Sequence, residues 1–406
     1  MKIASVIAEF NPFHNGHAHL VQKTKEECGA DYVVAFMSGD FVQRGAPAIC
    51  DKFTRAEAAV KCGVDAVFEL PVVYATGAAP DFAFGGVSMA ENMGCCDFLA
   101  FGSECGDLDT LQKAAILISE ETEEFKEKLM TALKKGLSYP AAISSVVSKT
   151  LKADENPLRA PNNTLGIEYL KALKLLNSKI TPFTIQRHLS SYHENGLVTD
   201  KETGISYTGA TYLRNVLTGS EETETLRRSM PEEAFETIFS EFKKSFPVVP
   251  DDFTLPLSLM LEKMTAEEVD SLTGNIDSKS KLKKNLLTFE KFTSLRSDLH
   301  DKSLTESAAG RLLTHALLGI YDKDVDRETG VKYLRLLAMN KDASPLLKKI
   351  KETSSIPLIT KMADFDISKY PMLMKDVYAS NLYQKVVSEK FGLPYKNDII
   401  HSPVIV

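Results

Sequence analysis

The sequence predicts an α/β fold, in which an open parallel sheet is followed by a mainly α-helical C-terminal region. In the first half, short apolar runs rich in β-branched and aromatic residues alternate with helical stretches. Strands that alternate with helices form parallel sheets. Amphipathic helical patterns then continue to about residue 391. A chain of 406 residues exceeds what one hydrophobic core usually covers, so we expect two or three domains.

The predicted elements follow one another in a regular order. Four strands are expected at residues 2–8, 31–38, 65–70 and 97–102. Helical signals fill residues 107–152, and "PNNTLGIEYLKALKLL" (161–176) has the pattern of a capped helix before a fifth strand at 179–187. After "GATYLRNVLTG" (209–219) the charged stretch "SEETETLRRSMPEE" marks the preferred domain boundary, which separates residues 1–220 from residues 221–406.

Composition excludes several classes of protein. The N-terminal apolar stretch is too short for a signal peptide core or a membrane span, so we expect a cytoplasmic protein with no membrane partner. The cysteines lack CxxC pairs and histidines at zinc-site spacing, which predicts buried thiols and no bound zinc or other protein-held metal. They are Cys28, Cys50, Cys62, Cys95, Cys96 and Cys105.

The net charge of −7 argues against a nucleic-acid partner, but the charge is unevenly distributed. Residues 221–270 hold 13 acids and 5 bases, whereas residues 271–406 hold 22 bases and 16 acids. The basic residues are densest in "SKSKLKKNLLTFEKFTSLR" (278–296), which includes Lys279, Lys281, Lys283 and Lys284. These lysines are candidates for contacting RNA, and an ordinary solvated helix face is the alternative.

The stretch "AEFNPFHNGHAHL" (8–20) places two histidines at the turn between the first strand and the helix after it. In an open parallel sheet, ligands bind at the carboxyl ends of the strands, and the N-terminus of a helix attracts anions. Gly16 lets the backbone approach a ligand closely, and Pro12 stiffens the turn. His14 and His17 could therefore donate hydrogen bonds to phosphoryl oxygens. A helix-capping turn with surface histidines is the alternative.

The context favours the phosphate site. A strand, "NPFHNGH" and a helix resemble the HxGH nucleotidyltransferase superfamily, which implies a Rossmann-like nucleotidyltransferase domain that acts on the α-phosphate of ATP. The second signature of that superfamily is approximated by "GATYLR", with Thr211 and Arg214 in register and Gly209 where serine is common. The guanidinium of Arg214 would suit the outer phosphates, and a salt-bridged surface arginine is the alternative.

Further motifs narrow the resemblance. The segments "EFNPFHNGH", "MSGDFVQRG", "ELP", "FGSE", "SYPAA", "PNNTLGIEYLKAL" and "YLRLLAMNK" occur in the order seen in the tRNA(Met) cytidine acetate ligase family. The resemblance implies a ligase that makes acetyl-adenylate and pyrophosphate from acetate and ATP, with Mg²⁺ accompanying the nucleotide and without acetyl-CoA. The acetyl group would then pass to N4 of the wobble cytidine of elongator tRNA(Met), giving N4-acetylcytidine. DNA is not an expected partner.

The resemblance also implies site residues. His14 and His17 correspond to the catalytic donors. The ATP-binding loop corresponds to Ile7, Ala8, Glu9, Phe10, Asn11, Pro12, Phe13, His14, Asn15, Gly16, His17, Ala18, His19 and Leu20. Further ATP contacts are expected from Gly102, Asn162 or Asn163, Arg187, His188, Thr211 and Arg214. A helix N-cap is the alternative for one of the two asparagines. Gln43 and Arg44 could hold acetate or the edge of the cytosine.

Two other functions stay open at this point. The first is an enzyme that uses the same phosphate site on a small molecule, such as an adenylyltransferase or a pantothenate-synthetase-like ligase. Such enzymes need no long helical C-terminal region, so the chain length disfavours them. The second is a nucleic-acid-binding protein with a vestigial HxGH turn, and the intact His14, Gly16, His17 and Arg214 argue against it.

Overall fold

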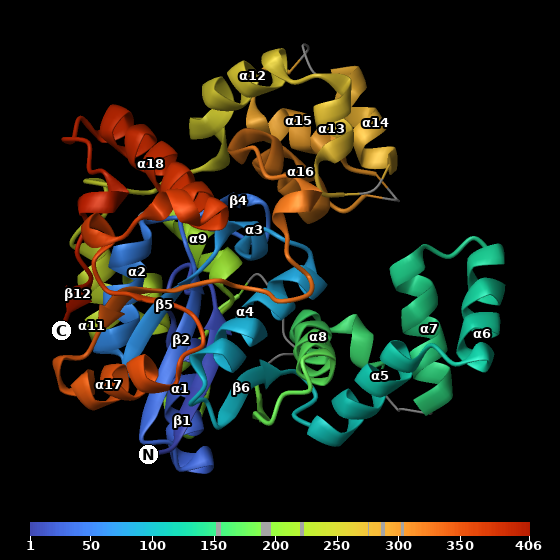
Figure 1. The fold of residues 1–406 in the computed structure, drawn as a ribbon, viewed down its shortest axis with the longest axis horizontal. Helices are drawn as coiled ribbons and strands as arrows, with labels where there is room; N and C mark the ends of the chain where they lie inside the picture. The colour runs from blue at the N-terminus through green and yellow to red at the C-terminus, as the bar shows by residue number, and fades with distance from the viewer. Residues whose placement is uncertain (152–155, 188–195, 220–222, 275, 286–288, 302–303) are drawn as a thin grey trace.

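The central sheet has the strand order β11-β10-β5-β2-β1-β6-β7, and β12 pairs with β10 (Figure 1). This computed structural model describes residues 1–151, 156–187, 196–219, 223–274, 276–285, 289–301 and 304–406. The strands are β1 (Ile3–Ala8), β2 (Tyr32–Ser38), β5 (Ala66–Leu70), β6 (Phe98–Ser103), β7 (Thr181–Gln186), β10 (Leu334–Met339), β11 (Leu358–Ile359) and β12 (Val404–Ile405). The strands β5, β2, β1, β6 and β7 are parallel, which confirms the five predicted strands and the α/β class.

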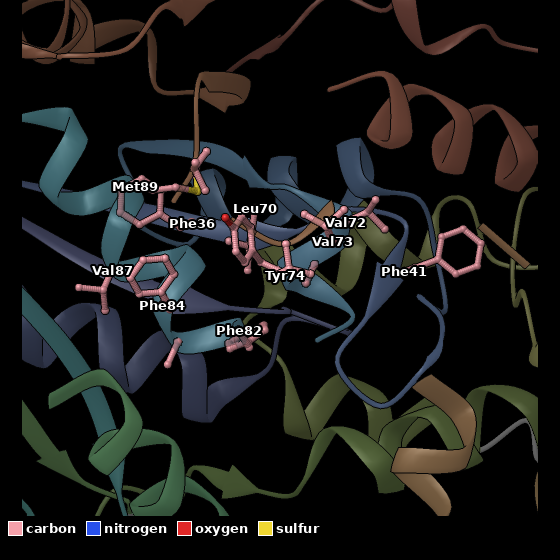
Figure 2. Packing of buried hydrophobic residues seen from close by; sticks show 14 of the residues in the cluster. Phe36, Phe41, Leu70, Val72, Val73, Tyr74, Phe82, Phe84, Val87 and Met89 are labelled. Carbon is pink, nitrogen blue, oxygen red and sulfur yellow. The ribbon is translucent and has the colours of Figure 1, made fainter. Parts of the chain in front are cut away.

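Helices cover both faces of the sheet. One face carries α1 (Asn15–Cys28), α2 (Lys52–Lys61), α9 (Ala210–Gly219), α10 (Thr223–Ser229) and α11 (Glu232–Phe239). The other carries α3 (Val72–Ala75), α4 (Ala79–Met93), α5 (Leu108–Glu120) and α8 (Pro161–Leu175). Neighbouring strand residues such as Phe36 and Met37 belong to opposite cores, as the two-residue period of a strand requires. Figure 2 shows Phe36 in the core on the face that carries α3 and α4, with Tyr74 and Phe84.

The carboxyl ends of the parallel strands meet at one edge of the sheet. Ala8 at the end of β1 lies opposite Met37 of β2, and Ser103 at the end of β6 lies opposite Gln186 of β7. The strand order reverses direction at β1, because β2 and then β5 lie on one side of it, whereas β6 and then β7 lie on the other. Such a reversal point is where open α/β sheets bind ligands.

A group of helices from the C-terminal half lies beyond this edge (Figure 1). It comprises α12 (Thr254–Lys263), α13 (Ala266–Ser271), α14 (Ile276–Asn285), α15 (Phe292–Leu299) and α16 (Glu306–Leu318). Two further helices, α6 (Glu123–Lys134) and α7 (Tyr139–Leu151), extend from α5, away from the sheet. Two short hairpins complete the strands: β3 (Phe41–Val42) with β4 (Ala46–Pro47), and β8 (Val198–Thr199) with β9 (Ser206–Tyr207). Within the described ranges, no helix has the length and apolar character that a membrane span requires.

The chain after residue 330 returns to the sheet, so the mainly α-helical C-terminal region also contributes strands that the sequence patterns did not predict. It adds β10, β11 and β12 and the helices α17 (Ser344–Thr353) and α18 (Pro371–Phe391). The strand β10 was hidden in the sequence because its short apolar run carries a charged residue, Arg335. The central sheet thus draws on both sides of the predicted boundary at residue 220, and the division into two domains stays a prediction.

A buried ion cluster fastens the returning chain to the sheet. Lys52 Nζ lies 2.8 Å from Glu69 Oε1 and 3.0 Å from Asp398 Oδ1. Arg335 Nη1 lies 2.9 Å from Glu69 Oε2 and 2.6 Å from Asp398 Oδ2. All four side chains are at most 4% exposed. Within this cluster two cations face two anions, so the four charges compensate one another, as burial requires.

Candidate active site

The predicted HxGH turn joins β1 to α1 at the reversal point of the sheet. Phe10 has φ of 45°, in the left-handed region that residues other than glycine rarely adopt, so the backbone bends sharply here. The rings of Phe10 and Phe13 are fully buried, and their centroids lie 5.0 and 5.5 Å from that of His17. Both rings pack against the His17 ring and fix its position.

Hydrogen bonds fix the tautomer of both histidines. The Nδ1 atom of His14, the N-cap of α1, accepts a hydrogen bond from the N–H of Gly16 at 3.1 Å. The Nδ1 atom of His17 accepts one from the N–H of His14 at 3.2 Å. A neutral imidazole that accepts at Nδ1 carries its proton on Nε2. Each ring therefore keeps an Nε2–H donor for a ligand. His14 caps the helix α1, as the alternative interpretation expects, and is a candidate donor to phosphate at the same time.

Both histidines are neutral at physiological pH. Burial lowers the pKa of His14 to about 3, and the charges of Arg187 and Arg214 lower it further in the same direction. Burial, followed by the effects of His14 and Arg187, also holds the pKa of His17 well below its ordinary value. Neutral imidazoles can stand side by side without mutual repulsion and still donate to an anion.

Two arginines give the site its positive charge. Arg214 on α9 donates from Nη1 to the carbonyl oxygen of Asn11 at 2.8 Å and from Nη2 to Thr211 Oγ1 at 3.1 Å. Arg187, after β7, donates from Nη1 to Asn162 Oδ1 at 3.2 Å. Burial lowers the pKa of both guanidinium groups. In the described ranges neither arginine forms a salt bridge with a carboxylate, so the alternative of a salt-bridged surface Arg214 is wrong and the site is suited to an anion.

The two asparagines of "PNN" play different roles, and neither is the N-cap of α8, which is Ala160. Asn163 is buried, and its Oδ1 accepts from the N–H groups of Glu104 and Cys105 at 2.9 and 3.2 Å. Asn162 is partly exposed and joins Glu104 to Arg187 through its amide. The N-cap alternative is therefore wrong for both, and Asn162 is better placed to meet a ligand.

Glu104 was missed in the sequence, although it stands in the "FGSE" motif. Its carboxylate accepts from the N–H of Asn162 at 3.2 Å and from the N–H of Asn163 at 2.8 Å. It thus occupies the N-terminus of α8, where a negative charge is stabilised by the free amide groups. Gly102 lies two residues earlier, and a Cβ there would come within 3.2 Å of Arg187 Cγ. Gly102 therefore leaves room for the Arg187 side chain.

The loop after β2 is held beside the HxGH turn. The buried guanidinium of Arg55 donates to the carbonyl oxygens of Glu9 at 2.6 Å and Ser38 at 3.1 Å. The N–H of Gln43 donates to Glu9 Oε1 at 2.9 Å. Gln43 is partly exposed and Arg44 is exposed, so both side chains can reach a ligand at this edge.

Residues 7–20 divide into a structural and an accessible set. Phe10, Asn11, Pro12, Phe13 and His14 are buried, and the amide of Asn15 donates to the carbonyl oxygens of Ser206 and Arg228 at 2.8 and 2.9 Å. Partly exposed residues are Ile7, Ala8, Glu9, Gly16, His17, Ala18, His19 and Leu20. Their contacts with a nucleotide stay predictions, and His188 lies outside the described residues.

The predicted lysine cluster lies on α14, apart from this site. Lys279 Nζ donates to the carbonyl oxygen of Asp270 at 2.8 Å, and Lys283 pairs with the Asp270 carboxylate at 2.7 Å. Lys281 forms an ion pair with Asp301, while Lys284 is exposed. Three of the four charges thus have acidic or carbonyl partners, and the RNA contact stays a prediction.

The sequence predicts that the cysteines are buried thiols and that the protein holds no metal. Cys28 and Cys50 are buried thiols, but Cys62, Cys95, Cys96 and Cys105 are partly exposed, so the expectation of burial is wrong for those four. All six thiols are free. Among the residues that the structure describes, no three or more His, Cys, Asp or Glu side chains cluster in a way that could hold a metal.

Comparisons with known proteins match this architecture. A family model described as HIGH Nucleotidyl Transferase matches residues 1–395. The chain belongs to the HIGH nucleotidyl transferase family. The match to this HIGH nucleotidyl transferase model includes the HxGH turn, the helical group beyond the sheet edge and the strand β10, so the family architecture extends through the C-terminal half.

Relatives within the family share nearly the whole chain. The tRNA(Met) cytidine acetate ligase of Acetivibrio thermocellus is 36% identical over 398 residues, 94% of each chain. That of Thermoanaerobacter sp. is 36% identical over 407 residues, 98% of this chain and 97% of the relative. The crystal structure of Thermotoga maritima TmcAL bound with α-thio ATP covers both chains completely, with 27% identity and a TM-score of 0.87. The resemblance of this HIGH nucleotidyl transferase to the acetate ligases is confirmed.

Proposed function

We propose that this chain is an ATP-dependent ligase that makes acetyl-adenylate from acetate and transfers the acetyl group to N4 of the wobble cytidine of elongator tRNA(Met). The observation that carries the proposal is the pair of neutral Nε2–H donors, on His14 and His17, beside Arg187 and Arg214. The names of the relatives support acetate and tRNA(Met) as substrates, and the ATP analogue bound to Thermotoga maritima TmcAL supports ATP as the nucleotide.

The site residues suit the first half-reaction. An acetate oxygen attacks the α-phosphorus of ATP, and the bond from that phosphorus to the bridging oxygen of pyrophosphate breaks. Charge builds on the phosphoryl oxygens, where His14 and His17 donate hydrogen bonds and Arg214 and Arg187 neutralise the polyphosphate. ATP enters as its Mg²⁺ complex, with the ion held by the phosphates as part of the substrate. Because the donors are fixed in place before ATP binds, they need little reorganisation in the transition state.

The second half-reaction consumes the adenylate. The N4 amine of cytidine attacks the acetyl carbonyl carbon, the carbon–oxygen bond to AMP breaks, and the amine loses a proton to solvent or to the departing phosphate. The exocyclic amine of cytosine is a weak nucleophile, so the mixed anhydride supplies the activated acyl donor in place of acetyl-CoA. The cytidine must leave its stack to reach the site, as bases in enzyme active sites do.

We further propose that residues 1–220 carry the ATP chemistry and that the region 221–406 helps to hold the tRNA. The helical group beyond the sheet edge faces the strand ends where the HxGH turn lies, which supports this division of labour. The proposed substrates place the protein in the cytoplasm, with neither DNA nor a membrane as a partner.

The test is a two-stage assay on the purified chain. Acetate-dependent exchange of labelled pyrophosphate into ATP, without RNA, reports the first half-reaction. Transfer of labelled acetyl to an unmodified elongator tRNA(Met) transcript reports the second, with acetyl-CoA as a comparison donor. Exchange that responds instead to a different carboxylate, with no RNA product, would favour a small-molecule ligase. Absence of exchange with any carboxylate would leave the vestigial-motif alternative.

A further inference from the structure

The helix α16 lies directly on the loop that carries Gln43 and Arg44. A Cβ atom on Gly45, whose φ is 69°, would lie 2.0 Å from the backbone nitrogen of Arg311, and one on Gly310 would lie 2.7 Å from the carbonyl oxygen of Arg44. The two backbones touch with no side chain between them, which only glycine permits. The helical group is therefore fixed against the edge of the active site at this point.

Arg311 is a largely buried cation with few partners. Its Nη1 donates to the carbonyl oxygen of Gln43 at a long distance of 3.4 Å, and burial lowers the pKa of its guanidinium. Across the described ranges it forms no ion pair, whereas the buried Lys52 and Arg335 each contact two carboxylates. A guanidinium has five N–H donors, so most of those on Arg311 have no acceptor among the residues that the structure describes.

Two more polar atoms at this junction lack partners. Within the part of the chain that the structure describes, the buried Arg296 Nε and Thr314 Oγ1 make no hydrogen bond. Arg296 Cδ would lie 3.5 Å from a Cβ on Gly310, and Thr314 follows Arg311 by three residues on α16. Both atoms are enclosed by protein and Arg296 Nη2 pairs with Glu306, so of these three residues the partly exposed Arg311 is the one that an external acceptor can reach.

Hydrogen bonds connect the junction between α16 and the Gln43 loop to the nucleotide site. The single residue Gln43 accepts from Arg311 at its carbonyl oxygen and donates its N–H to Glu9 of the HxGH loop. The charge of Arg44 also lowers the pKa of Arg214. Positive groups therefore continue from Arg214 through Arg44 to Arg311, which extends the anion-binding surface from the ATP site toward the helical group.

We propose that Arg311 and Arg44 bind a backbone phosphate of the RNA next to the acceptor cytidine. This inference rests on the proposed function and adds a specific contact to it. The open position of Arg44 suits a phosphate that arrives on a large partner, whereas acetate needs an enclosed place beside the α-phosphate. The planar fork of Arg311 matches two phosphate oxygens.

The test uses the full-length chain and three variants. Arg311→Gln removes the charge, Arg311→Lys keeps the charge without the fork, and Arg327→Gln is the matched control. Arg327 is a surface arginine that already pairs with Asp81 and Asp322. Binding of an unmodified elongator tRNA(Met) transcript is measured by filter retention at several salt concentrations. Acetate-dependent pyrophosphate exchange is measured on the same preparations and also reports folding.

The expected result is selective. Arg311→Gln weakens RNA binding about tenfold or more and lowers the salt slope by about one unit, with exchange and the Arg327→Gln control near wild type. Arg311→Lys recovers the slope but not the full affinity. Wild-type RNA binding in Arg311→Gln would overturn the inference, as would loss of exchange with intact RNA binding, which would assign Arg311 to acetate. A wild-type chain that exchanges pyrophosphate but has no RNA affinity would overturn both this inference and the tRNA half of the proposed function.

Discussion

The imidazole rings of His14 and His17 stack with their centroids 3.7 Å apart, and each accepts a backbone N–H on Nδ1. The same two hydrogen bonds close the first turn of α1, so the start of the helix and the tautomers of the histidines are fixed together. An ordinary capping box uses serine or threonine with glutamate. Histidines at these positions retain a second nitrogen, which is free to act on a ligand.

Replacing either histidine should abolish most of the first half-reaction. In His14→Asn the amide can still cap α1, because asparagine is a favourable N-cap residue, but the Nε2–H donor is lost. We expect acetate-dependent pyrophosphate exchange to fall by about 10²- to 10³-fold in His14→Asn and in His17→Asn, the usual effect of removing one preorganised donor.

The exposed His300 provides the matched control for these variants. His300→Asn should exchange pyrophosphate at the wild-type rate, and all three variants should unfold at similar urea concentrations. Near wild-type exchange in a folded His14→Asn or His17→Asn variant would remove these residues from the chemistry.

Replacing Arg214 should weaken ATP binding and alter the neighbouring histidine. Loss of a charge-assisted contact with phosphate lowers affinity by about 10- to 100-fold, and lysine should not restore it because the fork geometry is lost. Since Arg214 contributes to the lowered pKa of His14, Arg214→Gln should raise that pKa toward its ordinary value. Calorimetry of ATP binding and an NMR titration of His14 measure the two effects. An unchanged ATP affinity would show that the outer phosphates bind elsewhere.

Much of the sheet was predictable because most of its strands are marked by a local pattern of apolar residues in the sequence. Four of the five parallel strands, β1, β2, β5 and β6, are largely apolar and largely buried, whereas the edge strand β7 is mostly half-buried or exposed. The helices between the strands give the alternation that defines the class. The strand β10 was missed because its charged Arg335 is compensated by Glu69 and Asp398, far away in the chain. Short runs such as β11 and β12, of two residues each, carry no periodicity at all.

The candidate site, too, was predictable only where its residues are close together in the sequence. The HxGH turn was predictable because its residues are consecutive and its chemistry depends on their spacing. The roles of Asn162 and Asn163 were not, because they depend on Glu104, which lies about sixty residues earlier. Arg311 could not be found from sequence, since its position against Gln43 comes only from the packing of α16 on the loop.

The ion cluster gives a prediction about stability. Arg335→Leu leaves Glu69 and Asp398 facing Lys52 alone, so one buried negative charge loses its compensation. Removing one partner of a buried ion pair typically costs about 3–5 kcal/mol of unfolding free energy. Urea unfolding should show a loss of that size, while the exposed pair in Lys332→Gln should cost about 1 kcal/mol or less. Equal effects of the two variants would contradict a structural role for the cluster.

His315 predicts a specific loss of stability in acid. Its ring is buried between Thr76 and Thr273, and burial lowers its pKa from 6.5 to about 4. When the pH falls below 6.5 the unfolded chain takes up a proton that the folded chain does not, so stability is lost between about pH 6.5 and pH 4. For these pKa values the loss from pH 7 to pH 5 is about 2 kcal/mol.

His315→Gln removes this titration and keeps a polar side chain. The variant should be less stable than wild type at pH 7, and the gap between the two should shrink by about 2 kcal/mol at pH 5. Urea unfolding at both pH values measures it. A gap that is independent of pH would mean that His315 carries an ordinary pKa in the folded protein.

The lysine cluster on α14 provides the last prediction. If Lys279, Lys281, Lys283 and Lys284 neutralise RNA phosphates, replacing all four by Glu should weaken tRNA binding and flatten its salt dependence, by roughly one unit of slope for each lost contact. Acetate-dependent pyrophosphate exchange should keep its rate. The structure adds a difficulty, because Asp270 and Asp301 already engage three of these lysines, and glutamates beside them would repel.

The converse variant resolves that difficulty. Asp270→Asn with Asp301→Asn removes the two carboxylates that pair with Lys283 and Lys281, without placing new charge on α14. If the cluster contacts RNA, this double variant should bind a tRNA(Met) transcript more tightly at low salt and show a steeper salt dependence, opposite to the four-fold Glu variant. Opposite shifts in two folded variants cannot come from a general loss of structure. Unchanged affinity and slope in the double variant would assign the lysines to the solvated face of α14 and leave the RNA contact to the junction of α16 with the Gln43 loop.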